Sequence, residues 1–230
     1  MKIENANFVL SKLNNNMYEI KVKNNDKLIN YFLKNLNSRH DRDVNFFESD
    51  KKNKFTFKAT QISTLQHFFN SPKSTVNYLI LQEIMKSGKI LIDALEKHNN
   101  TVIDFELKDF LIVINGEIEY NTYDVKCIFV GFDKVVKFKN TLEINKPFKK
   151  TLFIAPEIMS IKSLPITIDY PIKSMYYSLA NICVYLLVKR IPKNYDEYKI
   201  SLEQLENSKL YWMILRCVGD NPEDRYLLFI

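Results

Sequence analysis

The sequence predicts an α+β fold in which a small β-rich part precedes a larger, mainly helical part. Residues 1–60 contain short apolar runs that alternate with polar spacers, a pattern typical of strands. Residues 75–98 and the segment after Pro171 instead carry apolar residues at helical spacing. The chain has 230 residues and is 46% hydrophobic, which is enough to bury the core of one domain or of two small lobes.

Four strands and one helix are predicted in the N-terminal part of the chain. The helix is the amphipathic segment "KLINYFLKNL", residues 27–36. Three consecutive asparagines follow the first strand, and because asparagine tolerates a left-handed backbone they can form a hairpin turn. The strand segments are "NFVLSKL" (7–13), "MYEIKVK" (17–23), "DVNFFES" (43–49) and "KFTFKAT" (54–60).

Three helices and two strands are predicted in the rest of the chain. The first helix covers 75–98, and the second opens after Pro171, because proline is favoured in the first turn of a helix. The third covers about 208–218 and ends at Gly219, a residue type common just beyond a helix C-terminus. The two strands lie in "DFLIVIN" (109–115) and "VKCIFVGF" (125–132).

Composition indicates an intracellular protein without a membrane span. No run of 18 or more uncharged apolar residues is present, and the N-terminus lacks the apolar core of a signal peptide. Cys127, Cys183 and Cys217 lie far apart inside apolar stretches, so we expect reduced core cysteines. The three histidines show no metal-ligand spacing, and we expect no metal site and a cytoplasmic location.

Residue usage also suggests a source. Asparagine, lysine and isoleucine are abundant, whereas the chain has four glycines. Such usage is expected of an AT-rich coding genome, for example that of a large DNA virus or a parasite. For a viral protein, the expected location is the host cytoplasm.

Positive charge is concentrated between residues 134 and 150. The chain carries a formal net charge of +6, and this stretch contains Glu143 as its only acidic residue after Lys134. Two interpretations stay open, namely a solvated loop face and a surface that binds a partner. The basic residues are Lys134, Lys137, Lys139, Lys146, Lys149 and Lys150.

Three ordered motifs resemble the C-terminal half of a protein kinase. "LFIAPEI" contains the Ala-Pro-Glu triplet that closes a kinase activation segment. The apolar helix "YYSLANICVYLLV" follows it, and "RCVGDNPEDR" stands near the end of the sequence. The resemblance covers the stretch from Leu152 to Arg225. It implies an ion pair between Glu157 and Arg225, since in that family the glutamate of the triplet pairs with an arginine.

The resemblance implies a two-lobed protein-kinase-like fold. Residues 1–60 would form the β-rich N-lobe, and residues 61–230 the mainly helical C-lobe, with an activation-segment-like region at 129–157. The kinase N-lobe usually contains five strands and one helix. Because so short a segment leaves little room for these elements, we expect a reduced N-lobe.

The catalytic positions of that family are changed in this chain. "ELKDFLIV" aligns with the kinase "DLKPxNIL", which places Glu106 at the catalytic aspartate and Leu111 at the metal-binding asparagine. "KCIFVGF" aligns with "KIxDFGL", which places Phe129 at the metal-binding aspartate. Magnesium needs oxygen ligands, and neither Leu111 nor Phe129 supplies one. Asp133 is the one acid that could replace the lost ligand, through a shifted register.

The nucleotide-binding positions are changed as well. No glycine precedes Gly88, so the glycine-rich loop that covers the phosphates of ATP is missing. Lys21 and Lys23 are weak candidates for the phosphate-binding lysine, because their alternation in "YEIKVK" suggests the outward face of a strand. We therefore expect ATP and magnesium binding to be absent or weak, and no cofactor.

The leading hypothesis is a catalytically inactive kinase-like domain, a pseudokinase, that binds or regulates another protein. Its expected partner is an acidic or phosphorylated protein surface. A divergent Ser/Thr protein kinase with weak phosphotransfer activity is the first alternative. A basic nucleic-acid-binding protein is the second, suggested by a pI of about 9.0 and 13% aromatic residues. Against it, aromatics such as Tyr176 and Trp212 have apolar neighbours and are expected in the core.

Overall fold

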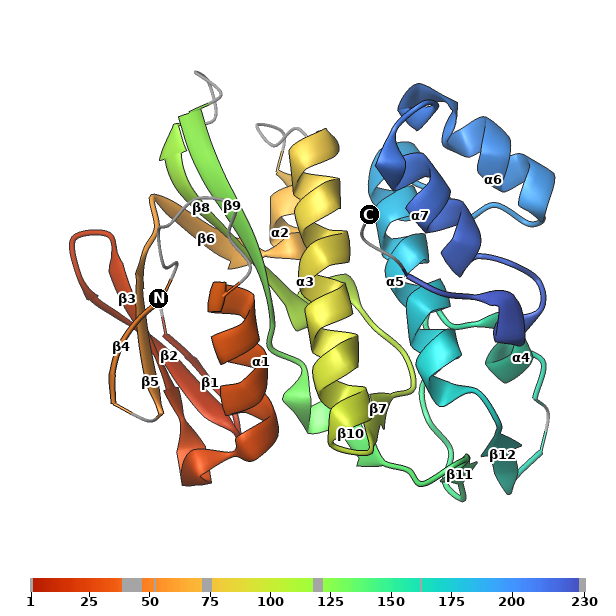
Figure 1. Cartoon of the computed structure of the whole chain (residues 1–230), viewed down its shortest axis with the longest axis horizontal. Helices are drawn as coiled ribbons and strands as arrows, with labels where there is room; N and C mark the ends of the chain where they lie inside the picture. The colour runs from red at the N-terminus through yellow and green to blue at the C-terminus, as the bar shows by residue number, and fades with distance from the viewer. Residues whose placement is uncertain are drawn as a thin grey trace.

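The computed structural model describes residues 2–38, 47–51, 53–71, 76–117, 122–161 and 163–227. In these ranges an antiparallel sheet of N-terminal strands lies at one side of the molecule (Figure 1). The C-terminal helices lie at the other side, and the long helix α3 (Tyr78–Lys97) runs between the two groups. The predicted α+β class is confirmed.

The N-terminal sheet has five strands in the order β1-β2-β3-β5-β4, and every neighbouring pair is antiparallel. Side chains alternate along β3, where Tyr18, Ile20 and Val22 are buried and Lys21 is exposed. This period of two is what a half-buried strand requires. The elements are β1 (Lys2–Glu4), β2 (Phe8–Asn14), β3 (Met17–Val22), α1 (Lys27–Ser38), β4 (Glu48–Lys51) and β5 (Lys54–Lys58).

Five strands and a helix therefore fit before Ala59, and the expectation of fewer elements in this part is wrong. They fit because the strands are short and the β2–β3 connection is tight. Asn14 pairs with Met17 across a turn in which Asn16 has a φ of 60°, as predicted for the three asparagines. The predicted strand at 43–49 falls partly outside the described residues, and β4 begins at Glu48.

The second part combines small sheets with helices. β6 (Gln61–Thr64), β8 (Phe110–Glu117) and β9 (Thr122–Phe129) form one antiparallel sheet, in the order β6-β8-β9, and α3 packs against β9. Two short strands, β7 (Asn100–Val102) and β10 (Val135–Lys137), pair with each other. The other elements are α2 (Leu65–Asn70), the 3-10 helices η2 (Leu107–Asp109) and η4 (Phe132–Lys134), β11 (Leu142–Ile144), α4 (Pro156–Met159), β12 (Ile166–Ile168), α5 (Pro171–Val188), α6 (Tyr195–Ser201) and α7 (Lys209–Cys217).

One large hydrophobic core joins the N-terminal sheet, α1, α3 and the later helices. Gly88 lets α3 and α5 approach closely, because a Cβ at this position would lie 2.3 Å from Cδ2 of Leu179. The three cysteines are free and buried, as predicted. Among the described residues, no helix has both the length and the apolar character needed to cross a membrane.

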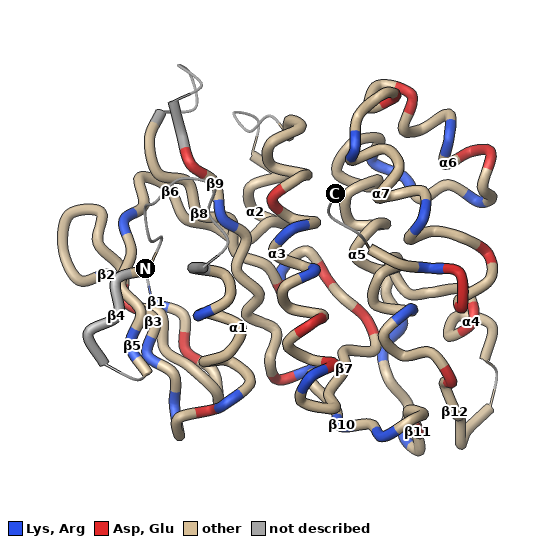
Figure 2. The backbone as a smooth tube through the Cα atoms, in the orientation of Figure 1, with Lys and Arg blue, Asp and Glu red and all other residues tan. Residues whose placement is uncertain are grey.

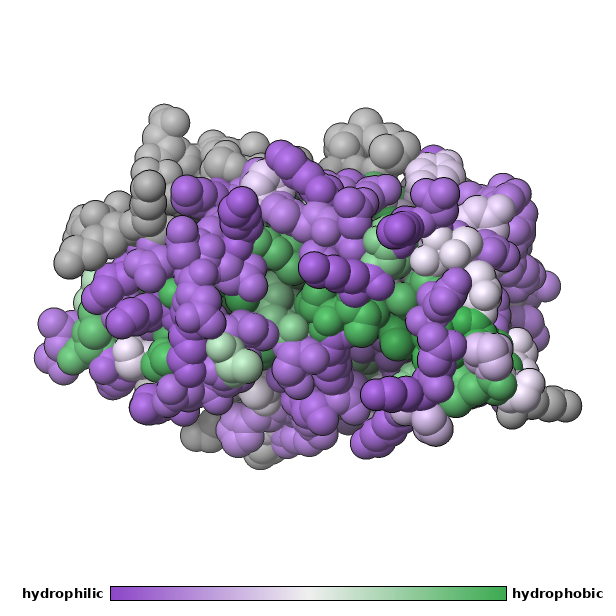
Figure 3. Space-filling model, turned by 90° about the horizontal axis from the view of Figure 1, so that it is seen from below, coloured by the Kyte–Doolittle hydropathy of each residue, from purple (hydrophilic) through white to green (hydrophobic). Residues whose placement is uncertain are grey.

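A smaller hydrophobic cluster is formed by side chains of β11, β12, α4 and the residues just before α4. Val136, Phe138 and Phe148 pack against it while remaining partly exposed. Figure 3 views the molecule from below and shows hydrophobic residues in a band across the middle of that face, with hydrophilic residues on both sides. Apolar side chains thus reach the surface near the region predicted to resemble an activation segment.

One local prediction for α7 is confirmed and one is wrong. The helix ends where predicted, with Val218 as its C-terminal cap (φ −100°, ψ 13°) and Gly219 as the next residue, although Gly219 does not adopt a left-handed backbone. Trp212 is 56% exposed and is not a core residue. It lies on the side of α7 opposite Leu210 and Ile214, which are buried.

Candidate functional site

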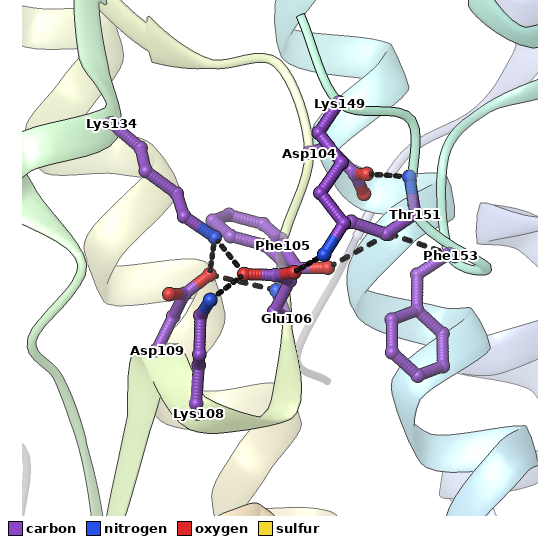
Figure 4. A network of polar contacts seen from close by, with 9 residues as sticks. All are labelled: Asp104, Phe105, Glu106, Lys108, Asp109, Lys134, Lys149, Thr151 and Phe153. Carbon is purple, nitrogen blue, oxygen red and sulfur yellow. Dashed lines mark hydrogen bonds and ion pairs between the residues drawn. The ribbon is translucent and has the colours of Figure 1, made fainter.

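Lys134 lies between two carboxylates, Glu106 and Asp109 (Figure 4). Its Nζ donates a hydrogen bond of 2.6 Å to Oε2 of Glu106 and one of 2.7 Å to Oδ2 of Asp109. Two further lysines approach Glu106 from outside, Lys108 at 2.8 Å and Lys149 at 3.9 Å. We call Glu106, Asp109 and Lys134 the ionic cluster.

The backbone around Asp109 fixes the position of this cluster. Asp109 ends η2, and its Oδ2 also accepts a 2.7 Å hydrogen bond from the backbone N–H of Glu106. Its carbonyl accepts a 2.7 Å hydrogen bond from the N–H of Val130, just after β9. Gly131 packs against the same side chain, since a Cβ there would lie 2.9 Å from Cγ of Asp109. With φ −80°, Gly131 is required by this close approach and not by a left-handed turn.

Burial and pairing act in opposite directions on the charges of the cluster. Burial raises the pKa of Asp109, and the hydrogen bond from Lys134 opposes that rise. Burial also acts to raise the pKa of Glu106, but the hydrogen bonds from Lys108 and Lys134 outweigh it and lower this pKa to about 2. The two carboxylates likewise overcome the effect of burial on Lys134 and raise its pKa. At neutral pH the cluster therefore contains an ionised Glu106 and a protonated Lys134.

Two pockets adjoin the ionic cluster. One has a volume of about 340 Å³ and includes Lys134, with Ile103 and Phe148 as apolar walls. The other has a volume of about 370 Å³ and extends toward Leu152. The pockets share four lining residues, and these are Glu106, Lys108, Lys149 and Thr151.

Asp104 forms the buried wall of the first pocket. Its Oδ2 accepts a 2.8 Å hydrogen bond from the backbone N–H of Thr151, whereas Oδ1 is buried and has no hydrogen-bond partner. Burial is the main cause that raises the pKa of this carboxyl to about 6. The hydrogen bond to Asp104 therefore connects the turn before η2 to the segment around Thr151. Because the carboxyl is buried, its ionised form lowers the stability of the fold at neutral pH.

Phe129 and Leu111, the residues at the two metal-binding positions of the resemblance, are core residues. Phe129 is 1% exposed, and Leu111 is fully buried in the middle strand β8. Neither side chain has an oxygen, so these positions do not fit a magnesium ion. Phe129 lies in an aromatic cluster in which its ring contacts Phe105, Phe110 and Phe132, and the ring of Phe132 in turn contacts Phe8 of β2 and Phe32 of α1.

The structure does not bring the other nucleotide or metal candidates to this site. Lys21 is exposed on the outer face of β3. Lys23 donates hydrogen bonds to Glu4 at 3.0 Å and to the carbonyl of Asn5 at 2.8 Å. Asp133 is exposed on η4 and lines neither of the two pockets.

Glu157 and Arg225 are brought together. Two nitrogens of the guanidinium contact the two carboxylate oxygens at 2.8 and 3.1 Å. Ser174 at the start of α5 donates a 2.7 Å hydrogen bond to the same carboxylate, and the guanidinium lies 4.7 Å from the centre of the Tyr177 ring. This network joins α4, α5 and the segment before residue 227.

The six lysines predicted to bind a partner do not act alike. Lys134 belongs to the ionic cluster, and Lys150 donates 2.8 Å hydrogen bonds to the carbonyls of Met159 and Ile161. Figure 2 shows basic residues following one another around β10 and β11. The other four lysines of this stretch are exposed and make neither of these contacts. They are Lys137, Lys139, Lys146 and Lys149.

Sequence reasoning missed the roles of Asp104, Asp109 and Thr151. A partial signal existed, because Glu106 and Asp109 have the i, i+3 spacing that places two side chains on one side of a single turn. Nothing local indicated that Lys134 would fill the space between them. Within the described ranges, no group of three or more His, Cys, Asp or Glu side chains is arranged to hold a metal ion.

Comparison with protein-family models gives no match for this chain. A search of curated proteins likewise finds no significant similarity. The function of the protein has to be argued from its own residues and their geometry.

Proposed function

We propose that this chain is a catalytically inactive protein-kinase-like domain that acts as a protein-binding or regulatory module. One observation carries the proposal. Phe129, which the resemblance places at a metal-binding aspartate, is buried in an aromatic cluster that reaches β2 and α1. A ring in this position cannot bind magnesium, and phosphoryl transfer depends on metal ions that neutralise the phosphates.

The order of the elements supports the same proposal. Five antiparallel strands and one helix come first, and the long helix α3 and the later helices follow. The Ala-Pro-Glu triplet begins α4, and its glutamate pairs with Arg225. The pair of Glu157 and Arg225 stabilises the fold and needs no nucleotide. Its presence is therefore compatible with a kinase-like fold that binds another protein without catalysing phosphoryl transfer.

The N-terminal sheet supports weak or absent ATP binding. The inner face of β3 presents Ile20 and Val22, and both are buried and apolar. A phosphate-binding lysine would have to stand on this face, but Lys21 points away from it. The turn from β1 to β2 is also engaged, because the side chain of Asn5 donates a 3.1 Å hydrogen bond to the carbonyl of Val130.

A thermal-shift titration with ATP, with and without Mg²⁺ or Mn²⁺, tests the absence of a nucleotide site. The expected result is an unchanged melting temperature, because neither the apolar inner face nor Phe129 offers a ligand to the phosphates or the metal. A metal-dependent rise of several degrees would overturn this part of the proposal. A kinase of known ATP affinity, measured under the same conditions, serves as the positive control.

The exposed lysines support an acidic or phosphorylated protein surface as the partner. Lys137, Lys139 and Lys146 lie near one another in sequence around β10 and β11 and face solvent. A peptide rich in glutamate and phosphoserine is the probe, and a triple Lys→Glu variant at these positions is expected to lose its binding. A variant of matched charge, with Lys2, Lys12 and Lys209 changed to glutamate, should retain it. If both variants lost peptide binding equally, the binding would depend on the net charge of the protein and not on a particular surface.

Weak kinase activity remains the second candidate, because Glu106 keeps a carboxylate at the wall of two pockets. It predicts phosphate transfer that Glu106→Gln or Asp133→Asn abolishes. Equal signals from the wild type and both variants would eliminate this candidate. Binding of duplex DNA that is stronger than peptide binding, and that the triple variant weakens, would instead favour the nucleic-acid alternative.

A further inference from the structure

The first pocket contains a buried carboxylate oxygen that the protein leaves without a partner. Asp104 is 7% exposed and lines this pocket of about 340 Å³. Its Oδ2 accepts a hydrogen bond from the N–H of Thr151, whereas Oδ1 has no hydrogen-bond partner among the described residues. Buried polar atoms are almost always hydrogen-bonded in folded proteins, because an unmade bond leaves the desolvation of the group uncompensated. Oδ1 therefore offers an acceptor to a ligand in the pocket.

The other charged groups of the pocket disfavour a cationic donor. Three ammonium groups line it, those of Lys108, Lys134 and Lys149. Among the described residues of the lining, the acids are Asp104 and Glu106, so positive charge is in excess. A positively charged ligand would be repelled by these lysines. A neutral O–H donor avoids the repulsion and still satisfies Oδ1.

The rest of the pocket combines apolar walls with a basic entrance. Ile103 and Phe148 line it and are partly exposed, and the ring of Phe148 is a surface on which another ring can pack. The side chains of Lys108 and Lys149 are 57% and 84% exposed, so they lie toward solvent. These features suit a ligand with an aromatic body and an anionic group at its outer end.

The side chain of Lys149 has to move before a ligand reaches Asp104. Oδ1 is shielded from water, and Figure 4 shows Lys149 crossing in front of the Asp104 carboxyl. Nζ of Lys149 lies 3.9 Å from Oε1 of Glu106, which is too far for a hydrogen bond. An exposed lysine held so weakly swings aside at little cost. An acidic ligand would give this ammonium a closer partner than Glu106 does.

We propose that the first pocket binds a small aromatic acid that carries a hydroxyl group at the end opposite its carboxylate. The hydroxyl donates to Oδ1 of Asp104, and the carboxylate pairs with Lys108 and Lys149. The ring packs against Ile103 and Phe148. The inference rests on this pocket alone and does not depend on the proposed function, whose partner surface uses other lysines.

Nuclear magnetic resonance titration of the whole chain with para-hydroxyphenylacetate, at a pH of about 7.5, tests the proposal. At this pH Asp104 is ionised, since burial raises its pKa only to about 6. The reporter is the amide of Thr151, because it donates to Asp104. A dissociation constant on the order of 1 mM is expected for a molecule of this size. Phenylacetate, which lacks the hydroxyl, should bind at least about 10-fold more weakly, because a hydrogen bond to a charged acceptor is lost.

Asp104→Asn tests the contact with the hydroxyl. The asparagine oxygen can still accept from Thr151, which leaves an amide NH₂ group in place of the acceptor. The preference for para-hydroxyphenylacetate over phenylacetate should then fall below about 3-fold. Asp133→Asn, at an exposed position outside the pocket, should keep the full preference.

Lys108→Met combined with Lys149→Met tests the contact with the carboxylate. The comparison ligand is para-hydroxyphenylethanol, in which an alcohol replaces the acid, and it should bind the wild type about 3-fold more weakly than the acid does. The double variant should bind both ligands equally. Lys137→Met, outside the pocket, should leave the difference unchanged.

The comparison of ligands on the wild type decides the proposal even if a variant fails to fold. Equal affinities of para-hydroxyphenylacetate and phenylacetate would overturn it, and so would an unchanged Thr151 amide at about 10 mM ligand. A hydroxyl preference that Asp104→Asn retains would also overturn it, because the hydroxyl would then bind elsewhere.

Discussion

The guanidinium of Arg225 binds the carboxylate of Glu157 through two hydrogen bonds, of 2.8 and 3.1 Å, between positions that are 68 residues apart in the sequence. Arg225 is fully buried, and its Nε also donates a 2.7 Å hydrogen bond to the carbonyl of Gly219. A buried charge that loses its partner is strongly destabilising, because the desolvation penalty is no longer compensated.

Glu157→Gln is therefore expected to lower the free energy of unfolding by about 3 kcal/mol, measured by urea denaturation. The exposed pair of Lys199 and Asp196, at 3.2 Å, provides the control. Lys199→Gln should change stability by less than about 0.5 kcal/mol. Similar effects of the two substitutions would contradict a structural role for the buried pair.

Gly131→Ala is expected to destabilise the protein by about 1–3 kcal/mol, because the new methyl group would lie 2.9 Å from Cγ of Asp109. Gly219→Ala is the matched substitution. A Cβ at Gly219 meets nothing within 4 Å, so this variant should be close to the wild type in stability. Thermal unfolding measures the melting temperatures of both variants. If both substitutions lowered the melting temperature equally, the close contact with Asp109 would not be the reason for glycine at position 131.

Asp104→Asn is expected to stabilise the protein at neutral pH. Burial raises the pKa of Asp104 to about 6 in the folded protein, from an ordinary value of 3.8. The folded state therefore binds the proton more tightly, and stability falls as pH rises from about 4 to about 6. Above a pH of about 6 the ionised carboxyl lowers the free energy of unfolding by the full amount, roughly 1–3 kcal/mol. The asparagine variant removes this destabilisation, and its side-chain oxygen can still accept the hydrogen bond from the N–H of Thr151.

Urea denaturation at a pH of about 4.5 and of about 7.5 gives the free energy of unfolding of the wild type and of the variant. The two free energies should differ little at the lower pH and most at the higher pH. Asp133→Asn, at an exposed position, should show no such trend. A variant that is less stable than the wild type at neutral pH would mean that the charge of Asp104 is favourable.

Phe129→Ala is expected to lower the free energy of unfolding by about 3–5 kcal/mol, since it removes a buried ring that contacts three others. Trp212→Ala removes a larger ring that is 56% exposed, so it should cost far less. Calorimetric unfolding of the two variants makes the comparison. A small effect of Phe129→Ala would argue against a packed aromatic cluster at this position.

Elements that are long or strongly periodic follow from the amino-acid sequence alone. β3, α3 and α5 were predictable because their patterns depend on neighbours two to four positions apart, which any reader of the chain can see. Very short strands such as β7 and β10 show no period and were missed. The contact between Glu157 and Arg225 was anticipated through the kinase-like motifs and not through any local pattern.

The ionic cluster, in contrast, exists only through tertiary packing. Lys134 lies 28 residues from Glu106 and 25 from Asp109, so their meeting depends on how η4 follows β9 and packs on η2. The same packing makes Gly131 necessary, through a side chain that the sequence does not connect with it. A charged residue in a basic stretch has the same local pattern whether it faces solvent or a buried carboxylate. Burial and long-range contacts distinguish the two cases, and these arise only when the chain folds.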